Sequence, residues 1–177
     1  MRDLTDFALQ CMDELDSIGI EYGNIIDFTV NTRAKNRWGQ CKAVPGGYRI
    51  NISAVLLDER NDEQGLKNTI IHELLHSCKG CMNHGENWKR LAAKVYREYG
   101  YNIKRTSSAA EKGMCEEAIA ERVEAKKQAR AARVTYKIQC QKCGHIYTHY
   151  RMCDSIRYPN LYSCGCAGCH GQLIRIS

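Results

Sequence analysis

The most informative stretch of the chain runs from residue 68 to residue 78 and reads NTIIHELLHSC. It belongs to a segment from about Asp62 to Cys78 whose apolar side chains recur with the period of a helix. On a helix, residues four apart project from one face, so His72 and His76 can bind a single zinc ion. Glu73 lies beside them, placed to accept a proton from the attacking water rather than to bind the metal. The stretch therefore predicts a catalytic zinc site.

Two imidazoles are not enough for a catalytic zinc ion, which usually takes three protein ligands and keeps one position open. His84 is the expected third ligand, because a turn at Gly80 can bring it back toward the metal, eight residues past His76. Glu98 is the rival ligand, of the kind that two-His-one-Glu peptidases use. We prefer His84 because all three histidines of the first 100 residues lie within thirteen residues. The alternative is that these histidines only pack the helix or lie on the surface.

The segments around this helix predict a small α+β domain. Residues 4–18 carry apolar side chains at the spacing of a core-facing helix, and Ile25–Val30 is a short strand candidate. Residues 36–41 have the composition of a polar loop, and Tyr48–Ser53 alternates as a half-buried strand should. A further helix is expected after residue 83.

The last part of the chain differs in composition from the first. Residues 1–100 hold 13 Lys/Arg and 14 Asp/Glu, net −1, whereas residues 101–177 hold 13 and 6, net +7. Six of the eleven cysteines fall in the last 38 residues. The chain has neither a signal-peptide pattern nor a long apolar run, so we expect reduced thiols that bind metal and no membrane partner. The expected location is the cytoplasm, with association to the nucleoid in a bacterium.

Two C-x-x-C pairs near the end of the chain predict a zinc ribbon. Cys140 and Cys143 form the first pair, and Cys166 and Cys169 form the second, with 22 residues between them. Four thiolates close a tetrahedral site, so this zinc is structural and supplies folding energy that a short segment lacks. The choice of ligands stays open because other donors lie nearby: Cys164 in place of Cys166, and Cys153 or His145 as spares.

The same segment carries charges and rings that suit a nucleic acid. Cationic groups neutralise phosphates and aromatic faces stack on unpaired bases, a combination that single-strand binding uses. We therefore expect contacts to single-stranded or partly unpaired DNA from Lys137, Lys142, Tyr147, Tyr150, Arg151 and Arg157. The alternative is that the tyrosines pack the small ribbon and the charge only keeps it soluble.

Several of these motifs together resemble the SprT-like metallopeptidase family, which includes Spartan-type DNA–protein crosslink proteases. The resemblance rests on four features: the HELLH pentapeptide, Asn83-His84-Gly85-x-x-Trp88, Arg37-Trp38-Gly39-x-Cys41 before the Tyr48–Ser53 strand, and the cysteine ribbon. It implies that His72, His76 and His84 bind zinc and that Glu73 is the catalytic base. Trp38 itself is expected to pack its loop onto the core.

The resemblance also implies a fold and a substrate site. The fold is a zincin-like domain with helices packed on a short antiparallel sheet, whose exposed strand binds substrate backbone by β-addition. The substrate contacts would come from Tyr48, Arg49, Ile50 and Asn51. The pair Cys78 and Cys81 is interpreted as loop thiols, with metal binding or a redox disulfide as the alternatives.

These expectations combine into a domain plan and a function. The plan has a metallopeptidase domain over residues 1–105, a linker with a solvated helix over 106–133 and the zinc ribbon over 134–177. The function is a zinc-dependent endopeptidase with two zinc ions per chain, one catalytic and one structural, acting on DNA-bound or DNA-crosslinked proteins. The alternatives are a nucleic-acid-binding zinc-ribbon regulator whose HExxH site is structural or inactive, and a peptidase that acts on free protein.

Overall fold

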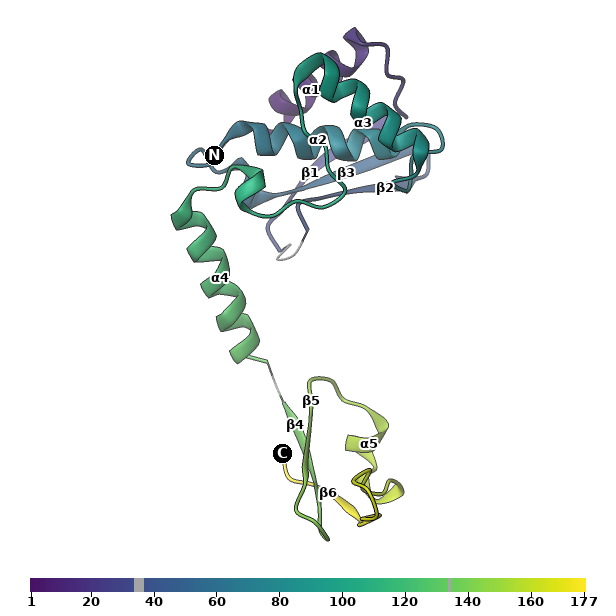
Figure 1. The fold of residues 1–177 in the computed structure, drawn as a ribbon, viewed down its shortest axis with the longest axis vertical. Helices are drawn as coiled ribbons and strands as arrows, with labels where there is room; N and C mark the ends of the chain where they lie inside the picture. The colour runs from purple at the N-terminus through teal and green to yellow at the C-terminus, as the bar shows by residue number, and fades with distance from the viewer. Residues whose placement is uncertain (34–36, 134) are drawn as a thin grey trace. The chain divides into compact units, whose positions relative to one another are not determined.

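A buried helix, α2 (Glu63–Ser77), is the centre of the first part of the computed structural model, which describes residues 1–33, 37–133 and 135–177. The helix begins where the Asp62 side chain accepts a hydrogen bond from the Gln64 N–H. Apolar side chains are buried around most of its circumference, because the sheet covers one side and two helices cover the other (Figure 1). These helices are α1 (Leu4–Ser17) and α3 (Glu86–Tyr99).

Three strands form the sheet of this unit, in the order β1-β3-β2. β1 (Ile25–Asn31) runs parallel to β3 (Gly47–Ser53), while β2 (Gly39–Val44) runs antiparallel to β3. The expectation of an antiparallel sheet is therefore wrong for β1. A tight turn with Gly46 at φ 87° closes β2 and β3 into a hairpin, so β1 joins the other side of β3, where it runs in the same direction. The 3₁₀ helix η1 (Ala54–Leu57) then leads toward α2.

The place of β3 in the sheet corrects a second expectation. Tyr48–Ser53 was expected to offer an exposed strand to substrate, but β3 pairs on both sides, and Ile50 and Ile52 are fully buried. The outer strands of the described sheet are β1 and β2. The loop expected over residues 36–41 is largely β2, although residue 36 lies outside the described residues. No residue of β2 is fully buried, which an edge strand allows, so the apolar signal of a strand is missing from its sequence.

The segment that follows α3 packs back onto this unit. The Asp62 N–H donates to the Gly113 C=O at 2.8 Å, and the Trp38 Nε1–H donates to the Ser107 C=O at 3.0 Å. The 3₁₀ helix η2 (Ala110–Lys112) lies against α2. Backbone groups of this segment are therefore satisfied by the helical core rather than by water.

The chain divides into two compact units, Met1–Glu124 and Ala125–Ser177. The boundary falls within α4 (Glu116–Ala131). The linker expected over residues 106–133 thus starts too early, because the segment up to η2 is part of the first unit. Polar composition suggested a solvated connection there, but hydrogen bonds and the burial of Lys112 hold that segment in place.

The second unit is a small antiparallel sheet with little apolar core. Its strands are β4 (Tyr136–Cys140), β5 (Ile146–His149) and β6 (Leu173–Arg175), in the order β5-β4-β6. Two short turns of helix, α5 (Asp154–Arg157) and η3 (Pro159–Leu161), come between β5 and β6. The expected α+β class is confirmed. Within the described residues, the search for a helix long and apolar enough to cross a membrane finds none.

Candidate metal centres

Three histidines converge in the first unit. The Nε2 atom of His72 lies 3.2 Å from Nε2 of His76 and 3.1 Å from Nε2 of His84. His72 and His76 stand one turn apart on α2, and His84 comes from the loop before α3. One donor atom of each ring lies within 4.8 Å of the others. Three imidazole nitrogens this close together fit a zinc ion and leave a further coordination position free.

A backbone carbonyl fixes the orientation of His76. Its Nδ1 lies 2.8 Å from the Cys81 carbonyl oxygen, which can only accept, so Nδ1 carries the proton and donates it. The lone pair of His76 is therefore on Nε2, the atom that faces the other two histidines. The sequence gives no signal for this contact, because it uses the main chain of Cys81 and not its side chain.

The indole of Trp88 packs against all three imidazoles. Its ring centroid lies 4.9 Å from that of His72, 5.8 Å from that of His76 and 4.7 Å from that of His84. Trp88 is 3% exposed, so it excludes water from this side of the cluster. Burial lowers the pKa of His72 to about 3 and also lowers the pKa of His84. Both rings are therefore neutral at neutral pH, which is the form that binds a metal.

The carboxylate of Glu73 lies next to the histidines but is not one of the grouped donors. The side chain is buried, and a hydrogen bond from the Cys41 backbone on β2 reaches its carboxylate. A Cβ at Gly39 would lie only 2.5 Å from Glu73 Oε1, so glycine is needed there. Burial raises the pKa of Glu73 to about 7, although Lys112 and Arg37 act in the opposite direction. A carboxylate tuned in this way can accept a proton and release it again near neutral pH.

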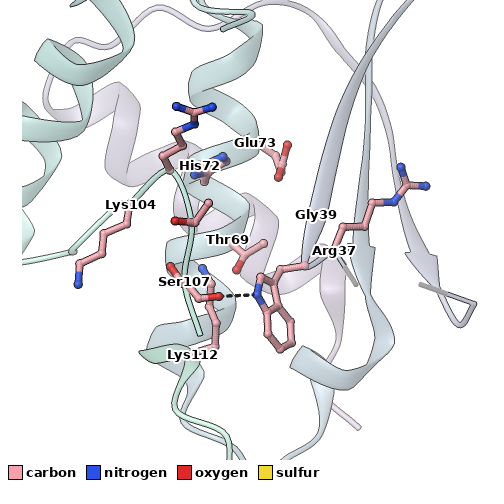
Figure 2. Close-up of a pocket in the computed structure, with 11 residues that line it drawn as sticks. Arg37, Gly39, Thr69, His72, Glu73, Lys104, Ser107 and Lys112 are labelled. Atoms are coloured by element: carbon pink, nitrogen blue, oxygen red, sulfur yellow. Dashed lines mark hydrogen bonds between the residues drawn. The ribbon is translucent and has the colours of Figure 1, made fainter. Parts of the chain in front are cut away.

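A cavity of about 370 Å³ opens beside Glu73. Figure 2 shows Thr69, His72 and Glu73 on the helix side, with Lys112 and Ser107 from the returning segment. The dashed bond in Figure 2 joins Ser107 to the indole of Trp38, which is another wall of the cavity. The Arg122 guanidinium lies 4.2 Å from the centroid of that indole. Trp38 thus packs its loop onto the core, as expected, and also shapes the cavity.

Other candidate groups of the first unit lie outside the histidine cluster. Glu98, the rival ligand, is exposed, pairs with Arg97 at 3.4 Å and is not grouped with the histidines. Cys78 and Cys81 are both buried free thiols. Burial raises the pKa of both thiols, which makes them poor nucleophiles. This agrees with the interpretation of Cys78 and Cys81 as loop thiols.

Four thiols gather in the second unit, all within 4.8 Å of one another: Cys140, Cys143, Cys164 and Cys169. The Sγ atom of Cys140 lies 3.6 Å from that of Cys169, and the Sγ of Cys143 lies 3.6 Å from that of Cys164. The backbone N–H of Cys143 donates to the Cys140 Sγ at 3.4 Å, which stabilises a thiolate there. Four thiolates in this arrangement fit a closed tetrahedral zinc site.

The expected ligand Cys166 is replaced by Cys164 in this group. The Cys164 N–H donates to the Gly171 C=O at 2.8 Å, and Ser163 bridges to Gln172, so the chain is held with Cys164 turned inward. Cys164 is 1% exposed, whereas Cys166 is partly exposed and its Sγ faces the Tyr147 hydroxyl at 3.6 Å. The C-x-x-C spacing favoured Cys166 as the fourth thiol. The pairing of residues 163–164 with residues 171–172 instead places Cys164 in the group.

Neither spare donor joins the thiol group. The Cys153 Sγ lies 3.1 Å from the Ser155 hydroxyl and 3.7 Å from the His149 Nδ1. His145 packs its ring against that of Tyr147, with centroids 4.5 Å apart. The described zinc-ribbon residues thus offer one set of four donors and not two competing sets.

Tyr147 is an unforeseen part of this centre. Its hydroxyl lies 3.1 Å from the Cys164 Sγ and accepts a hydrogen bond from the Gly165 N–H at 3.0 Å. The hydrogen bond from Tyr147 is the main reason that the pKa of Cys164 is lowered to about 6. The sequence marked Tyr147 as an aromatic residue for stacking, but it could not indicate which thiol its hydroxyl would meet.

The residues expected to contact DNA differ in the contacts that they already make within the second unit. Lys142 donates from Nζ to the Cys169 C=O at 2.9 Å, and Arg157 lies 4.0 Å from Asp154. Tyr147 is half-buried, whereas the other five residues are exposed: Lys137, Lys142, Tyr150, Arg151 and Arg157. Of the six, Lys142, Tyr147 and Arg157 therefore have polar contacts within the second unit, and the Arg133 guanidinium lies 5.8 Å from the ring centroid of Tyr150.

The helix-borne histidine cluster with its adjacent glutamate defines the class of site found in zinc metallopeptidases. The SprT-like family model matches residues 10–107, which is more than half of the chain, so this protein belongs to the SprT-like family. The matched range contains the histidine cluster, Glu73 and β2. A search of curated proteins finds no match.

Proposed function

We propose that this protein is a zinc-dependent endopeptidase. The observation that carries the proposal is the position of Glu73, which is buried beside the histidine cluster but outside its donor group, at the edge of a cavity. A purely structural zinc site would not require such a carboxylate. The SprT-like family supports the proposal, since it is associated with a metallopeptidase-like fold.

Each residue of the cluster has a part in this reaction. His72, His76 and His84 would hold the zinc ion, which when bound polarises the scissile carbonyl and acidifies water. Glu73 accepts the proton of the attacking water and passes it to the nitrogen of the leaving amine. A pKa of about 7 suits a group that must do both at neutral pH. The Cys81 carbonyl keeps His76 in the tautomer that binds metal.

The substrate backbone would bind at β2 rather than at β3. β3 is paired on both sides, which removes Tyr48, Arg49, Ile50 and Asn51 as main-chain partners of a peptide. β2 is an outer strand, and its residue Cys41 already hydrogen-bonds to Glu73. An extended peptide added at this edge would pass close to the catalytic carboxylate.

We further propose that the second unit binds DNA and that the substrates are proteins bound or crosslinked to DNA. The excess of basic residues after residue 100, net +7, supports this part of the proposal. Tyr150 is 53% exposed and Arg151 is exposed beside it, a ring and a cation that suit unpaired bases. Residence in the cytoplasm, at the nucleoid of a bacterium, belongs to the same proposal.

The test is hydrolysis of a DNA-bound protein by the zinc-loaded full chain, with and without DNA. Glu73→Gln should lower kcat by about 10²- to 10⁴-fold, the usual loss when a general base is removed. Zinc content and the thermal unfolding curve should not change. The matched control is Glu98→Gln, the same chemical change at an exposed site. Hydrolysis by Glu73→Gln within about tenfold of the unaltered protein would remove Glu73 from the mechanism.

DNA binding is tested separately on the same chain. Replacing Arg151 by Gln should weaken binding to single-stranded oligonucleotides and reduce the salt dependence by about one released counterion. Fluorescence anisotropy at two salt concentrations measures both quantities, with Lys89→Gln in the first unit as control. DNA binding without any hydrolysis would favour the regulator over the peptidase. Hydrolysis without effect of DNA would favour a peptidase of free protein.

A further inference from the structure

Lys112 is a buried lysine beside the catalytic cluster, in a segment that the sequence marked only as a linker. It ends η2, and its side chain is 6% exposed. A side chain at Gly65 would collide with the Lys112 carbonyl oxygen, so the Lys112 backbone lies directly against α2. The Lys112 N–H donates to the carbonyls of Ser108 and Ala109 at 3.2 Å each. The backbone of Lys112 is therefore fixed by its contacts with α2 and with its own 3₁₀ turn.

The ammonium of Lys112 extends into the cavity next to Glu73. Figure 2 shows the side chain running from η2 toward Thr69, within the space that Ser107 and His72 also border. Among the described residues, its ammonium makes no hydrogen bond and no ion pair within 4 Å, whereas the neighbouring Lys104 pairs with Glu111 at 2.7 Å. Glu73 and Glu111 attract this charge through space, but no described acceptor contacts the ammonium, so it can donate a charge-assisted hydrogen bond to an anionic ligand in the cavity.

The charge of the cavity as a whole has the same sign. Its lining includes four cationic residues, although Figure 2 shows the Arg37 and Lys104 side chains extending away from the cavity and Lys104 pairs with Glu111; Glu73 is the one carboxylate of the lining among the described residues. The cations are Arg37, Lys104, Arg105 and Lys112. The hydroxyls of Thr69, Thr106 and Ser107 add polar groups, and the indole of Trp38 supplies an apolar wall. A short acidic side chain has the charge, the size and the hydrogen-bonding capacity for this cavity.

We propose that this cavity is a specificity site for an aspartate or glutamate side chain of the substrate, close to the scissile bond, and that Lys112 is the residue that pairs with it. The inference rests on the proposed peptidase function and adds a substrate preference to it. The cavity shares His72 and Glu73 with the catalytic cluster, so the bound side chain belongs to a residue near the cleaved bond. The proposed role of Lys112 is substrate selection, in addition to its lowering effect on the pKa of Glu73.

The experiment uses the zinc-loaded full chain and a neutral peptide in which a single glutamate is moved from position to position. Cleavage should be faster for glutamate than for glutamine at one position, by about tenfold in kcat/KM, as expected for a charge-assisted hydrogen bond in a partly buried site. Lys112→Met should reduce this ratio to about one, whatever change in the absolute rates follows from the loss of its charge near Glu73. Lys89→Met on α3 is the control, since Lys89 is exposed and pairs only with Glu86 among the described residues. Its ratio should equal that of the unaltered protein.

Binding of the same peptides to the Glu73→Gln protein separates this inference from the proposed function. If the unaltered protein cleaves no peptide, but glutamate peptides bind more tightly than glutamine peptides and Lys112→Met removes this difference, the peptidase proposal fails and the anion site stands. If peptides are cleaved with equal kcat/KM for glutamate and glutamine at every position, the peptidase stands and the specificity site is wrong. That comparison needs no variant, so it holds even if Lys112→Met does not fold. A DNA oligonucleotide is also tested as a competitor of the peptides for the cavity. If Lys112→Met abolishes this competition and no peptide shows a preference for glutamate, the cavity binds phosphate and the inference is overturned.

Discussion

The histidine centre and the cysteine centre hold their ligands by different means. Behind the histidines lies an apolar core to which α1, α2, α3 and the sheet all contribute, and the three ligands are not part of it. In the second unit the buried apolar cluster among the described residues has five members, and two of them belong to the thiol group that could bind a metal ion. These five are Ile138, Cys140, Ile156, Cys164 and Leu173.

From this difference we propose opposite roles for a metal ion at each of the two centres. In the first unit the helix and the Cys81 carbonyl position the imidazoles without a metal, so a zinc ion there would bind to an already folded unit. In the second unit a metal ion at the four thiols would join strand β4 to the segment around Cys164 and would replace the core that so short a chain cannot build. The comparison predicts that metal removal unfolds one unit and spares the other.

Metal removal has the largest expected effect. A chelator should unfold the second unit, because a structural zinc ion contributes roughly 10–16 kcal/mol of apparent binding free energy to folding. The first unit should keep its structure and lose only its metal. Hydrogen exchange followed by mass spectrometry reports each unit within the intact chain. Persistent protection of β4 and β5 in the chelated protein would show that the small apolar cluster suffices without metal.

Removal of one ligand from the histidine centre should have a smaller and purely local effect. His84→Ala should weaken zinc binding there by more than the roughly 10- to 100-fold that the loss of an outer hydrogen-bond partner costs. The melting curve of the first unit should change little, because His84 is not part of its core. A competition titration with a chromophoric chelator measures the affinity, and Glu98→Ala is the control. Equal zinc affinity in both variants would return Glu98 to consideration as a ligand.

The cysteine centre offers a matched pair of variants. Cys164→Ser should release the structural zinc and reduce protection of β4, because Cys164 is one of the four grouped thiols. Cys166→Ser should leave the zinc in place, since Cys166 is not one of the four grouped thiols, although its side chain hydrogen-bonds to the Tyr147 hydroxyl and to Cys164. Zinc release during titration with a thiol reagent distinguishes the two. The opposite ranking would restore Cys166 as the ligand.

The sequence predicted the parts of the molecule that depend on periodic burial or on ligand spacing. The helices α1, α2 and α3 and the convergence of His72, His76 and His84 follow from local patterns. Local patterns do not contain the order of strands in a sheet. The sequence therefore predicts an exposed edge at β3, whereas the structure has this edge at β2. Long-range backbone pairing brings Cys164 into the thiol group, and the contacts of Lys112 and Tyr147 depend on segments distant in the chain.

The smallest predicted effect concerns the hydroxyl of Tyr147. Tyr147→Phe removes the hydrogen bond that lowers the pKa of Cys164 to about 6 from its ordinary value of 9.0, so protons compete better with zinc for this thiolate. Zinc affinity should fall by about tenfold, and zinc should be released at a higher pH when the solution is acidified. The phenyl ring remains, so stacking on a DNA base should be retained. A pH titration of zinc release, with Tyr150→Phe as control, measures the shift. Unchanged zinc release together with weakened DNA binding would mean that Tyr147 acts at the nucleic acid and not at the metal, which would make the cysteine centre independent of its aromatic neighbour.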